Sequence, residues 1–137
     1  MVYITRRERF CAAHKLYNEE WTEDENLSIF GKCSNPNWHG HNYELYVTVK
    51  GVPDKQTGFV MNLSVLSKLI EEKILSKIDH KNLNLDVPFL SNIIPSTENL
   101  TITIWNELEK EIEKMGGKLH CIKLFETENN FAEYFGK

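Results

Sequence analysis

Hydrophobic and polar residues alternate most regularly between positions 41 and 50. The apolar members of this alternation are Tyr43, Leu45, Val47 and Val49. Side chains two positions apart point to the same face of a β-strand, so this segment is predicted to be a strand with one buried face. The stretch from Tyr3 to His14 opens with several β-branched and aromatic residues and predicts an earlier strand.

Two later segments have the spacing of amphipathic helices. Asn62 is a suitable N-cap for a helix whose apolar residues recur every three or four positions and which ends near Asp79 and His80. A second helix is predicted to begin within residues 95–98, where a serine or threonine can cap it and a glutamate suits the helix dipole. The glycine pair at 116–117 ends this second helix.

Strands over 119–126 and 131–135 complete the predicted order ββααββ. This order indicates an α+β fold in which a four-stranded antiparallel sheet carries two helices on one face, all within one domain spanning 1–137. Residues 18–29 are expected to form a loop with a short helical piece, and residues 83–95 to be irregular. Because such a sheet has two open edges, we expect the chain to oligomerise by pairing them.

The composition narrows the class of protein. Of the 137 residues, 41% are hydrophobic and 26% are charged, with a formal net charge of −4. These values are typical of a globular domain and give no indication of nucleic-acid binding. No apolar run is long enough to span a membrane and residues 1–9 do not resemble a signal peptide, so we expect a cytoplasmic protein. Three cysteines without framework spacing favour free thiols over disulfides.

The candidate chemistry is concentrated just before the strand at 41–50. His39 and His41 flank Gly40 and share the parity of the apolar face, so both imidazoles can point toward one place. A catalytic zinc ion takes three protein ligands and keeps one coordination position open. His14, at the end of the first predicted strand, is the candidate third ligand for Zn²⁺. The alternative is that each histidine is an unrelated surface or partly buried residue.

The cysteines differ in their surroundings. Cys33 follows Lys32 in a loop rich in Gly, Asn and Pro, where a reactive group can be exposed. A thiol acts as a base or nucleophile only as the thiolate, which a nearby cation or metal favours. An inert loop cysteine is an equally good interpretation from these residues alone. Cys11 and Cys121 lie inside strand patterns and are interpreted as small buried hydrophobic residues.

Three further ionisable residues attract interest. Asp79 and His80 are adjacent at a helix end, where the carboxylate could orient a proton-transferring imidazole, although a histidine that only interacts with the helix dipole is the simpler interpretation. Glu126 shares the parity of the apolar residues in its strand. A carboxylate on an apolar face needs a partner, and two adjacent N–H donors of a guanine-like ring would serve, unless Glu126 lies beyond the strand end in solvent.

Five blocks of the chain, taken together and in order, resemble a known family. They are Phe10 to His14, Gly31 to Cys33 with Asn35 to Tyr43, Asp79 to Leu83, Ser96 to Asn99, and Phe125 to Thr127 with Asn129 and Asn130. With these blocks the chain resembles the 6-pyruvoyl-tetrahydropterin synthase family of the tunnelling-fold (T-fold) superfamily over nearly its whole length.

The resemblance implies a fold, an assembly and a set of site residues. Three T-fold chains would close a twelve-stranded β-barrel, and two such trimers would stack as a homo-hexamer. The metal ligands would be His14, His39 and His41, holding Zn²⁺. The catalytic residues would be Cys33 as general base, with Asp79 and His80 as a proton relay that reaches the thiol from a neighbouring subunit. The substrate-binding residues would be Glu126, which anchors the pterin ring, with Thr97 and Glu98 at the pocket wall.

The reaction implied by the resemblance starts from 7,8-dihydroneopterin triphosphate. It eliminates triphosphate and shifts hydrogens within the molecule, giving 6-pyruvoyl-tetrahydropterin without an external redox cofactor. Lys15 and Lys32 are candidates for holding the triphosphate of this substrate. Trp38 departs from the pattern of some relatives, which carry a small residue there, and it could form part of the pocket wall.

Two alternative functions remain, one a related enzyme and one a non-catalytic binding module. The related 6-carboxy-tetrahydropterin synthase of the queuosine pathway uses the same substrate, but its typical cysteine stands closer to the His-Gly-His block than Cys33 does here. A non-catalytic pterin- or zinc-binding module is less favoured, since a binder would not need Cys33, Asp79 and His80. A structural zinc site is disfavoured because such sites are closed and usually contain cysteines. The pathway, whether tetrahydrobiopterin, a tRNA base or folate, is left open.

Overall fold

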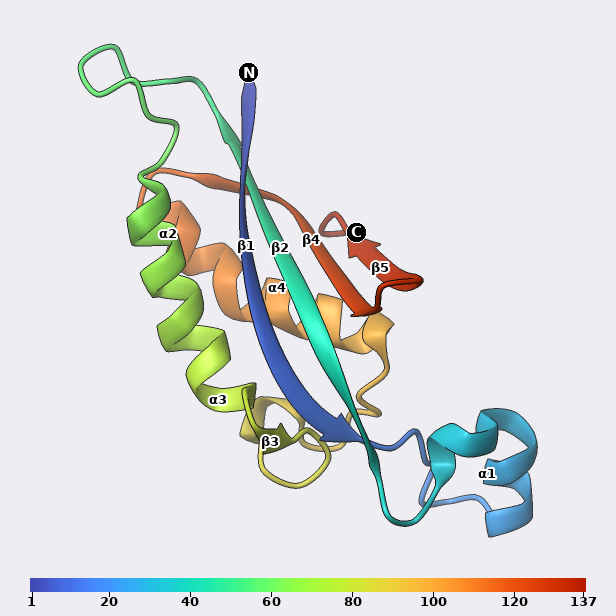
Figure 1. The fold of residues 1–137 in the computed structure, drawn as a ribbon. Helices are drawn as coiled ribbons and strands as arrows, with labels where there is room; N and C mark the ends of the chain where they lie inside the picture. The colour runs from blue at the N-terminus through green and yellow to red at the C-terminus, as the bar shows by residue number, and fades with distance from the viewer.

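A computed structural model describes residues 1–137 as a twisted sheet with its two long helices on one side (Figure 1). The strands are β1 (Val2–His14), β2 (His39–Gly51), β3 (Lys81–Asn82), β4 (Lys118–Thr127) and β5 (Asn130–Tyr134). The helical segments are α1 (Glu23–Phe30), η1 (Gly31–Ser34), α2 (Leu63–Ile70), η2 (Glu71–Leu75), α3 (Ser76–Ile78), η3 (Pro88–Leu90) and α4 (Thr97–Lys114). The α+β class and the order of the main elements are therefore as the sequence predicts.

The sheet corrects one expectation, because it has five strands in the order β3-β1-β2-β4-β5 and is mixed. Its four long strands pair antiparallel, but the two-residue strand β3 runs parallel to β1. Backbone hydrogen bonds attach this segment to the end of β1, from the His80 amide to the Cys11 carbonyl (2.7 Å) and from the Leu83 amide to the Ala13 carbonyl (2.8 Å). Two residues are too few to produce a recognisable alternation, so no sequence pattern predicted β3.

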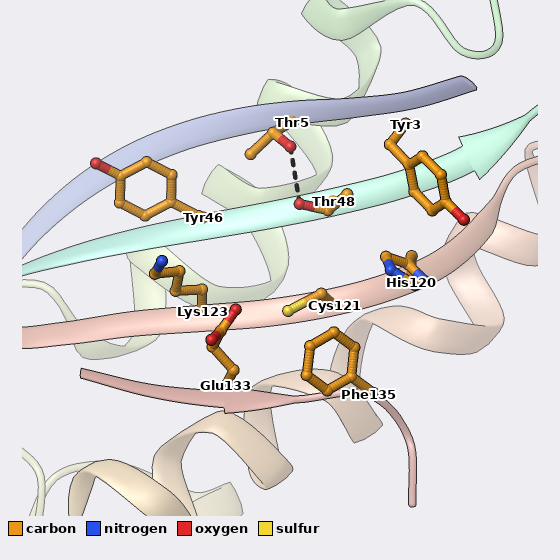
Figure 2. Close-up of a pocket in the computed structure, with 9 residues that line it drawn as sticks. All are labelled: Tyr3, Thr5, Tyr46, Thr48, His120, Cys121, Lys123, Glu133 and Phe135. Atoms are coloured by element: carbon orange, nitrogen blue, oxygen red, sulfur yellow. Dashed lines mark hydrogen bonds between the residues drawn. The ribbon is translucent and has the colours of Figure 1, made fainter.

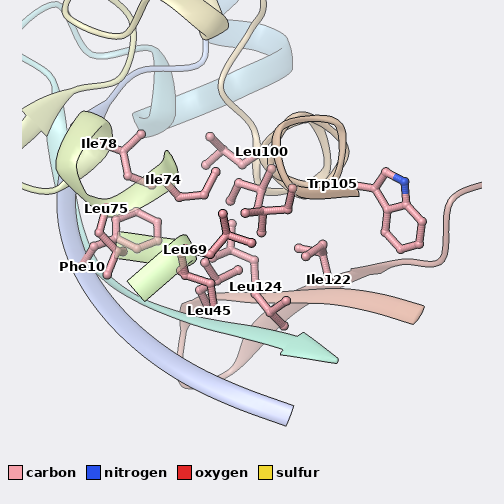
Figure 3. Close-up of a cluster of buried hydrophobic side chains, with 14 of the residues drawn as sticks. Phe10, Leu45, Leu69, Ile74, Leu75, Ile78, Leu100, Trp105, Ile122 and Leu124 are labelled. Atoms are coloured by element: carbon pink, nitrogen blue, oxygen red, sulfur yellow. The ribbon is translucent and has the colours of Figure 1, made fainter. Parts of the chain in front are cut away.

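The hydrophobic core lies between the covered face of the sheet and the helices, and Figure 3 shows many of its side chains. The apolar face predicted for β2 is fully buried there: Tyr43, Leu45, Val47 and Val49 are all 0% exposed. They pack with the apolar stripes of α2 and α4, among them Leu66, Ile70, Leu100, Ile104 and Leu108. Full burial of one such aliphatic side chain contributes about 1.5–3 kcal/mol, which makes this layer the main source of stability.

The first long helix begins where the sequence predicts. The Asn62 side chain accepts a hydrogen bond from the Ser64 amide (2.8 Å), which satisfies one of the free donors of the first turn. A single π-helical segment, η2, interrupts the helix before it ends at Ile78. His80 follows with a backbone φ of +60°. This left-handed conformation is uncommon for a residue with a β-carbon, and here it turns the chain from the helix into β3.

The opposite face of the sheet carries no helix and combines aromatic and polar side chains (Figure 2). The hydroxyls of Thr5 and Thr48 hydrogen bond across β1 and β2 at 2.8 Å. The His120 ring contacts Tyr3 and Phe135, with ring centroids 4.6 and 5.6 Å away. This face is therefore less apolar than the core face. No helix anywhere in the structure combines the length and the hydrophobicity that crossing a bilayer requires.

Candidate metal centre and active site

The pairing of β1 with β2 brings three histidines together at one end of the sheet. His14 is the register partner of His39, and Ala12 is the partner of His41. Because His14, His39 and His41 all have the parity of the core face, their rings converge. The ring centroids lie 4.6 Å apart for His14 and His39, 5.1 Å for His14 and His41, and 4.9 Å for His39 and His41. One ligand atom from each lies within 4.8 Å of the other two.

The hydrogen bonds of this histidine cluster leave one side of it unpartnered. The His14 side chain is 1% exposed, and its Nδ1 lies 2.8 Å from the Pro95 carbonyl oxygen. A carbonyl can only accept, so Nδ1 carries the proton and the lone pair remains on Nε2. His14 Nε2, His39 Nδ1 and His41 Nε2 are all buried without a hydrogen-bond partner. Such buried polar atoms are costly unless something binds them, and a zinc ion fits this donor set.

The surroundings of His14 and His39 favour the protonation state that a metal requires. Burial lowers the pKa of His14, and the neighbouring imidazoles add to this effect against the opposing influence of the Pro95 hydrogen bond. Burial and the proximity of His41 likewise lower the pKa of His39. Neutral imidazole is the metal-binding form, so these surroundings favour a cation among the three rings.

Glu126 on β4 completes one side of the histidine cluster. Its Oε2 lies 3.8 Å from His14 Nε2, and its Oε1 lies 3.8 Å from His41 Nε2. The Thr97 hydroxyl, at the first turn of α4, donates a hydrogen bond to Glu126 Oε2 at 2.9 Å. The pairing of β4 with β5 is irregular between Phe125 and Thr127, so Glu126 stands at a bulge, a common way to redirect a side chain. The strand therefore extends through Glu126, and the side chain is partly buried at 20% exposure.

Tyr43 also borders the site, although the sequence analysis assigned this residue only to the core. Its ring stacks on Phe10 with a centroid distance of 4.7 Å, and its hydroxyl lies 3.4 Å from His14 Nδ1. Burial, with a further contribution from Glu126, raises the pKa of Tyr43 far above its usual range, so the phenol stays neutral. Tyrosine on an apolar face of a strand that also carries histidines is the sequence signal for this contact.

A second cluster of ionisable residues lies where the end of α3 meets β1. His80 Nδ1 is 3.0 Å from Asp79 Oδ1, and Asp79 Oδ1 also accepts a hydrogen bond from the Cys11 amide at 3.0 Å. Ligand atoms of Cys11, Asp79 and His80 lie within 4.8 Å of one another. Burial opposes ionisation of Asp79, but hydrogen bonds from Cys11 and His80 outweigh it and lower the pKa of this carboxyl.

The positions of the cysteines differ in part from the sequence interpretation. Cys121 is buried as predicted, at 6% exposure, but Cys11 is only partly buried. Cys11 has the opposite parity to the buried residues Phe10 and Ala12, which directs it away from the core. The interpretation of Cys11 as a buried hydrophobic residue was therefore wrong. The segment Phe-Cys-Ala-Ala-His is too short and too uniformly apolar to show which face of the strand carries the thiol.

Other predicted residues lie outside these two clusters. Cys33 is partly buried in η1, where its carbonyl accepts a hydrogen bond from the Leu16 amide at 2.7 Å, and it belongs to neither group of clustered ligands. The Glu98 side chain is exposed in the first turn of α4. Within one chain, the structure therefore groups the histidines with Glu126 and Thr97, and Asp79 with His80, but adds Cys33 to neither group.

The lysines proposed for triphosphate binding are also separate. The Lys15 ammonium stands over the rings of Trp38 and Tyr17, at 4.5 and 4.8 Å from their centroids. Trp38 has a backbone φ of +67°, a left-handed conformation that costs a non-glycine residue about 1–2 kcal/mol. Lys32 is exposed on η1. Trp38 thus forms a wall beside Lys15, immediately before His39. The sequence suggested that Trp38 could be a pocket wall but did not show which residue it would lie against.

Comparisons with known proteins agree with this geometry. The family model described as 6-pyruvoyl tetrahydropterin synthase matches residues 3–137. The 6-pyruvoyl tetrahydrobiopterin synthase of Pongo abelii is 48% identical over 98% of this chain and 91% of its own, and that of Homo sapiens is 46% identical over the same shares. The solved structure of Caenorhabditis elegans 6-pyruvoyl tetrahydropterin synthase superposes with a TM-score of 0.92 at 34% identity, covering 99% of this chain and 96% of that one.

Proposed function

The chain belongs to the 6-pyruvoyl tetrahydropterin synthase family, and on this premise we propose that it is a zinc-dependent lyase acting on 7,8-dihydroneopterin triphosphate. The products are 6-pyruvoyl-tetrahydropterin and triphosphate. The observation that carries the metal dependence is the convergence of three buried, unpartnered imidazole nitrogens beside a carboxylate. Relatives that are named for this synthase and nearly half identical in sequence support the substrate.

His14, His39 and His41 are the proposed zinc ligands. When bound, zinc supplies Lewis acidity, which favours loss of a proton from a carbon next to a polarised oxygen. The Pro95 carbonyl holds His14 in the tautomer whose Nε2 is available, and burial keeps this ring neutral. The chain itself thus presents a preformed set of nitrogen donors, and three such ligands leave room for substrate.

Glu126 is the proposed anchor of the pterin ring. Its carboxylate can accept two hydrogen bonds from adjacent N–H groups of the heterocycle, a pairing that fixes the ring in one orientation. The Thr97 hydroxyl already donates to Glu126 Oε2 and would hold the carboxylate in position during binding. Glu98, one residue further along α4, is proposed to lie at the mouth of this pocket.

Cys33, Asp79 and His80 are proposed to transfer the protons. Cys33 would remove the carbon-bound proton as a thiolate, and the His80 imidazole, oriented by Asp79, would carry protons between the thiol and the substrate. Because Cys33 lies in neither ligand cluster of its own chain, we propose that a thiol and a relay pair from two subunits complete each site. Edge pairing into a trimeric β-barrel, with two trimers forming a homo-hexamer, would bring them together.

Identification of the product tests this function directly. Purified protein loaded with zinc is incubated with dihydroneopterin triphosphate, and the pterin product and released triphosphate are measured. The proposal predicts 6-pyruvoyl-tetrahydropterin and one triphosphate per turnover. A carboxy-pterin with acetaldehyde would instead assign the chain to 6-carboxy-tetrahydropterin synthase chemistry. Pterin binding without release of triphosphate would make it a binding module.

Subunit complementation tests the shared site. A Cys33→Ala chain and a His80→Ala chain are each expected to be inactive as homo-oligomers. When they are unfolded and refolded together, mixed oligomers would contain some sites with an intact Cys33 from one chain and an intact His80 from the other. Recovery of activity on mixing supports the shared site, whereas no recovery from well-folded mixed oligomers contradicts it.

A further inference from the structure

Two hydrogen bonds hold Cys11 beside Asp79 and His80, one to the Asp79 side chain and one between backbone groups. The Cys11 amide donates to Asp79 Oδ1 at 3.0 Å, and the His80 amide donates to the Cys11 carbonyl at 2.7 Å. These two bonds fasten the end of α3 to β1 and fix the left-handed turn at His80. These bonds place the Cys11 backbone beside the Asp79 carboxylate and the His80 backbone, so the three side chains start from neighbouring points.

The three side chains offer the donor types that zinc-class ions prefer. A thiolate, a carboxylate and an imidazole are all common zinc ligands, and one atom from each lies within 4.8 Å of the others. The His80 side chain is 78% exposed and Asp79 is 38% exposed, so small rotations can bring their donors onto one ion. A thiolate and a carboxylate together carry two negative charges, which balance a divalent cation.

In the single chain, an open hollow gives an ion access to this cluster. It has a volume of about 460 Å³, and Cys11, His80 and Asn82 contribute to its lining together with His41 of the histidine cluster. Lys81 also lines the hollow, and its side chain is exposed, so the ammonium group can extend into water. The thiol is directed away from the core face on which His14 lies, since the two residues are an odd number of positions apart in β1.

We propose that Cys11, Asp79 and His80 form a second divalent-cation site, selective for zinc-class ions and built from different ligands than the histidine cluster. Oxygen-preferring cations such as Mg²⁺ are not expected to bind, because the set contains one thiolate and only one carboxylate. Binding displaces the thiol proton and replaces the Asp79 to His80 hydrogen bond by coordination. The site is therefore weaker than the histidine cluster, whose nitrogens have no bonds to give up.

The second site has a consequence for activity that rests on the proposed function. If Asp79 and His80 carry protons during turnover, an ion that occupies both stops the relay. Zinc in excess of the first equivalent is then inhibitory, and a chelator that removes only the weaker ion restores activity. The Cys11→Ser variant, which keeps Asp79 and His80, should need at least about tenfold more zinc for the same inhibition, since even an outer-sphere partner is worth that much at zinc sites.

Cobalt titration tests the site without relying on activity. Co²⁺ takes the place of zinc in tetrahedral sites, and a thiolate ligand gives it a charge-transfer absorption that nitrogen and oxygen ligands do not produce. The zinc-loaded protein is titrated with Co²⁺, and the near-ultraviolet spectrum is followed for the wild type, Cys11→Ser and Cys33→Ser. We expect a thiolate band in the wild type and in Cys33→Ser, and its loss in Cys11→Ser.

Two further variants keep the result decisive. His80→Ala changes an exposed side chain and is expected to weaken cobalt binding at this site by more than about tenfold, even if Cys11→Ser were poorly folded. His39→Ala, which removes a ligand of the first site, is expected to retain the thiolate band, so failure of the proposed zinc enzyme and failure of this site are distinguishable. Absence of the band in the wild type, or a band that Cys33→Ser abolishes and Cys11→Ser retains, overturns the proposal.

Discussion

Two groups of potential metal ligands begin on the same strand and differ in almost every physical respect. His14 and Cys11 both belong to β1, but they point to opposite sides of it. On the core side, His14 is buried, His39 and His41 are partly buried, and three buried nitrogens of the cluster have no partner. On the other side, Asp79 is hydrogen bonded to the Cys11 amide and to His80, and His80 is 78% exposed.

This difference in burial and hydrogen bonding predicts how tightly each cluster binds a metal ion. Buried polar atoms without partners are rare in folded proteins, so their presence indicates that something else satisfies them. A group that is exposed and already hydrogen bonded is stable without an ion, and a metal must compete with those bonds and with water. The histidine cluster is therefore expected to bind zinc tightly, and the Cys11 cluster to bind it weakly.

The largest predicted effect comes from removing a ligand of the histidine cluster. His39→Ala is expected to lose the bound zinc and to lower kcat/KM roughly a thousandfold, because the Lewis acid supplies several kcal/mol at about 1.4 kcal/mol per tenfold. Zinc content and turnover of the purified variant are measured together. His120→Ala on the uncovered sheet face is the matched control and should retain both. Full zinc content in His39→Ala would contradict the assignment of this ligand.

The next effect separates the thiol from the metal. Cys33→Ser is expected to lower kcat by about 10²-fold, the lower end of the contribution typical of a general base, while zinc content stays at the wild-type level. The measurement is single-turnover kinetics with metal analysis on the same sample. The control is Cys121→Ser, a change to another cysteine that the proposed chemistry does not use. Wild-type turnover in Cys33→Ser would remove Cys33 from the mechanism.

A smaller effect is predicted at Glu126, the proposed anchor of the substrate ring. Glu126→Gln is expected to reduce kcat/KM by about 10- to 100-fold, since hydrogen bonds to a charged group contribute about 1.5–3 kcal/mol. Thr97→Val removes the 2.9 Å hydrogen bond that positions Glu126 and should have a smaller effect in the same direction. Pterin affinity, measured by fluorescence titration, should fall in both variants. If Glu126→Gln instead lost zinc with pterin affinity unchanged, Glu126 would be a metal ligand.

The smallest effect concerns the stability that the Cys11 cluster provides. Asp79→Asn weakens the hydrogen bond to the Cys11 amide and the pairing with His80, and is expected to reduce the free energy of unfolding by about 1 kcal/mol at neutral pH. Because the pKa of folded Asp79 is lowered, its contribution is present above the unfolded pKa of about 3.9 and is lost as pH falls through the folded pKa.

Urea unfolding at several pH values checks this prediction. The difference between wild type and Asp79→Asn should be constant near neutrality and shrink under acidic conditions. Asp24→Asn, which changes an exposed carboxylate of α1, is the control and should change stability little. A difference between wild type and Asp79→Asn that persisted at acid pH would show that the carboxylate charge is not the source.

Much of the fold was predictable because long elements leave strong patterns. The alternation of Tyr43 to Val49 identified both β2 and its buried face, and the same parity placed His39 and His41 on that face. Asn62 marked the start of α2 correctly. These features depend on local periodicity and capping, which the sequence displays directly.

The features that escaped prediction depend on contacts between distant segments. Strand β3 exists because its backbone meets β1, and the bulge at Glu126 arises from its pairing with β5. The association of Cys11 with Asp79 joins residues 68 positions apart. No local pattern contains such information. The proposed contact between Cys33 and the relay pair likewise depends on a second subunit.

Zinc-edge anomalous diffraction from crystals of the protein tests the central claim most directly. The account predicts one strong peak per chain, bonded to His14 Nε2, His39 Nδ1 and His41 Nε2 and within about 2.0–2.1 Å of each nitrogen. Crystals grown with zinc that show no density among these three rings, or whose strongest peak lies at Cys11 and Asp79 instead, would contradict it.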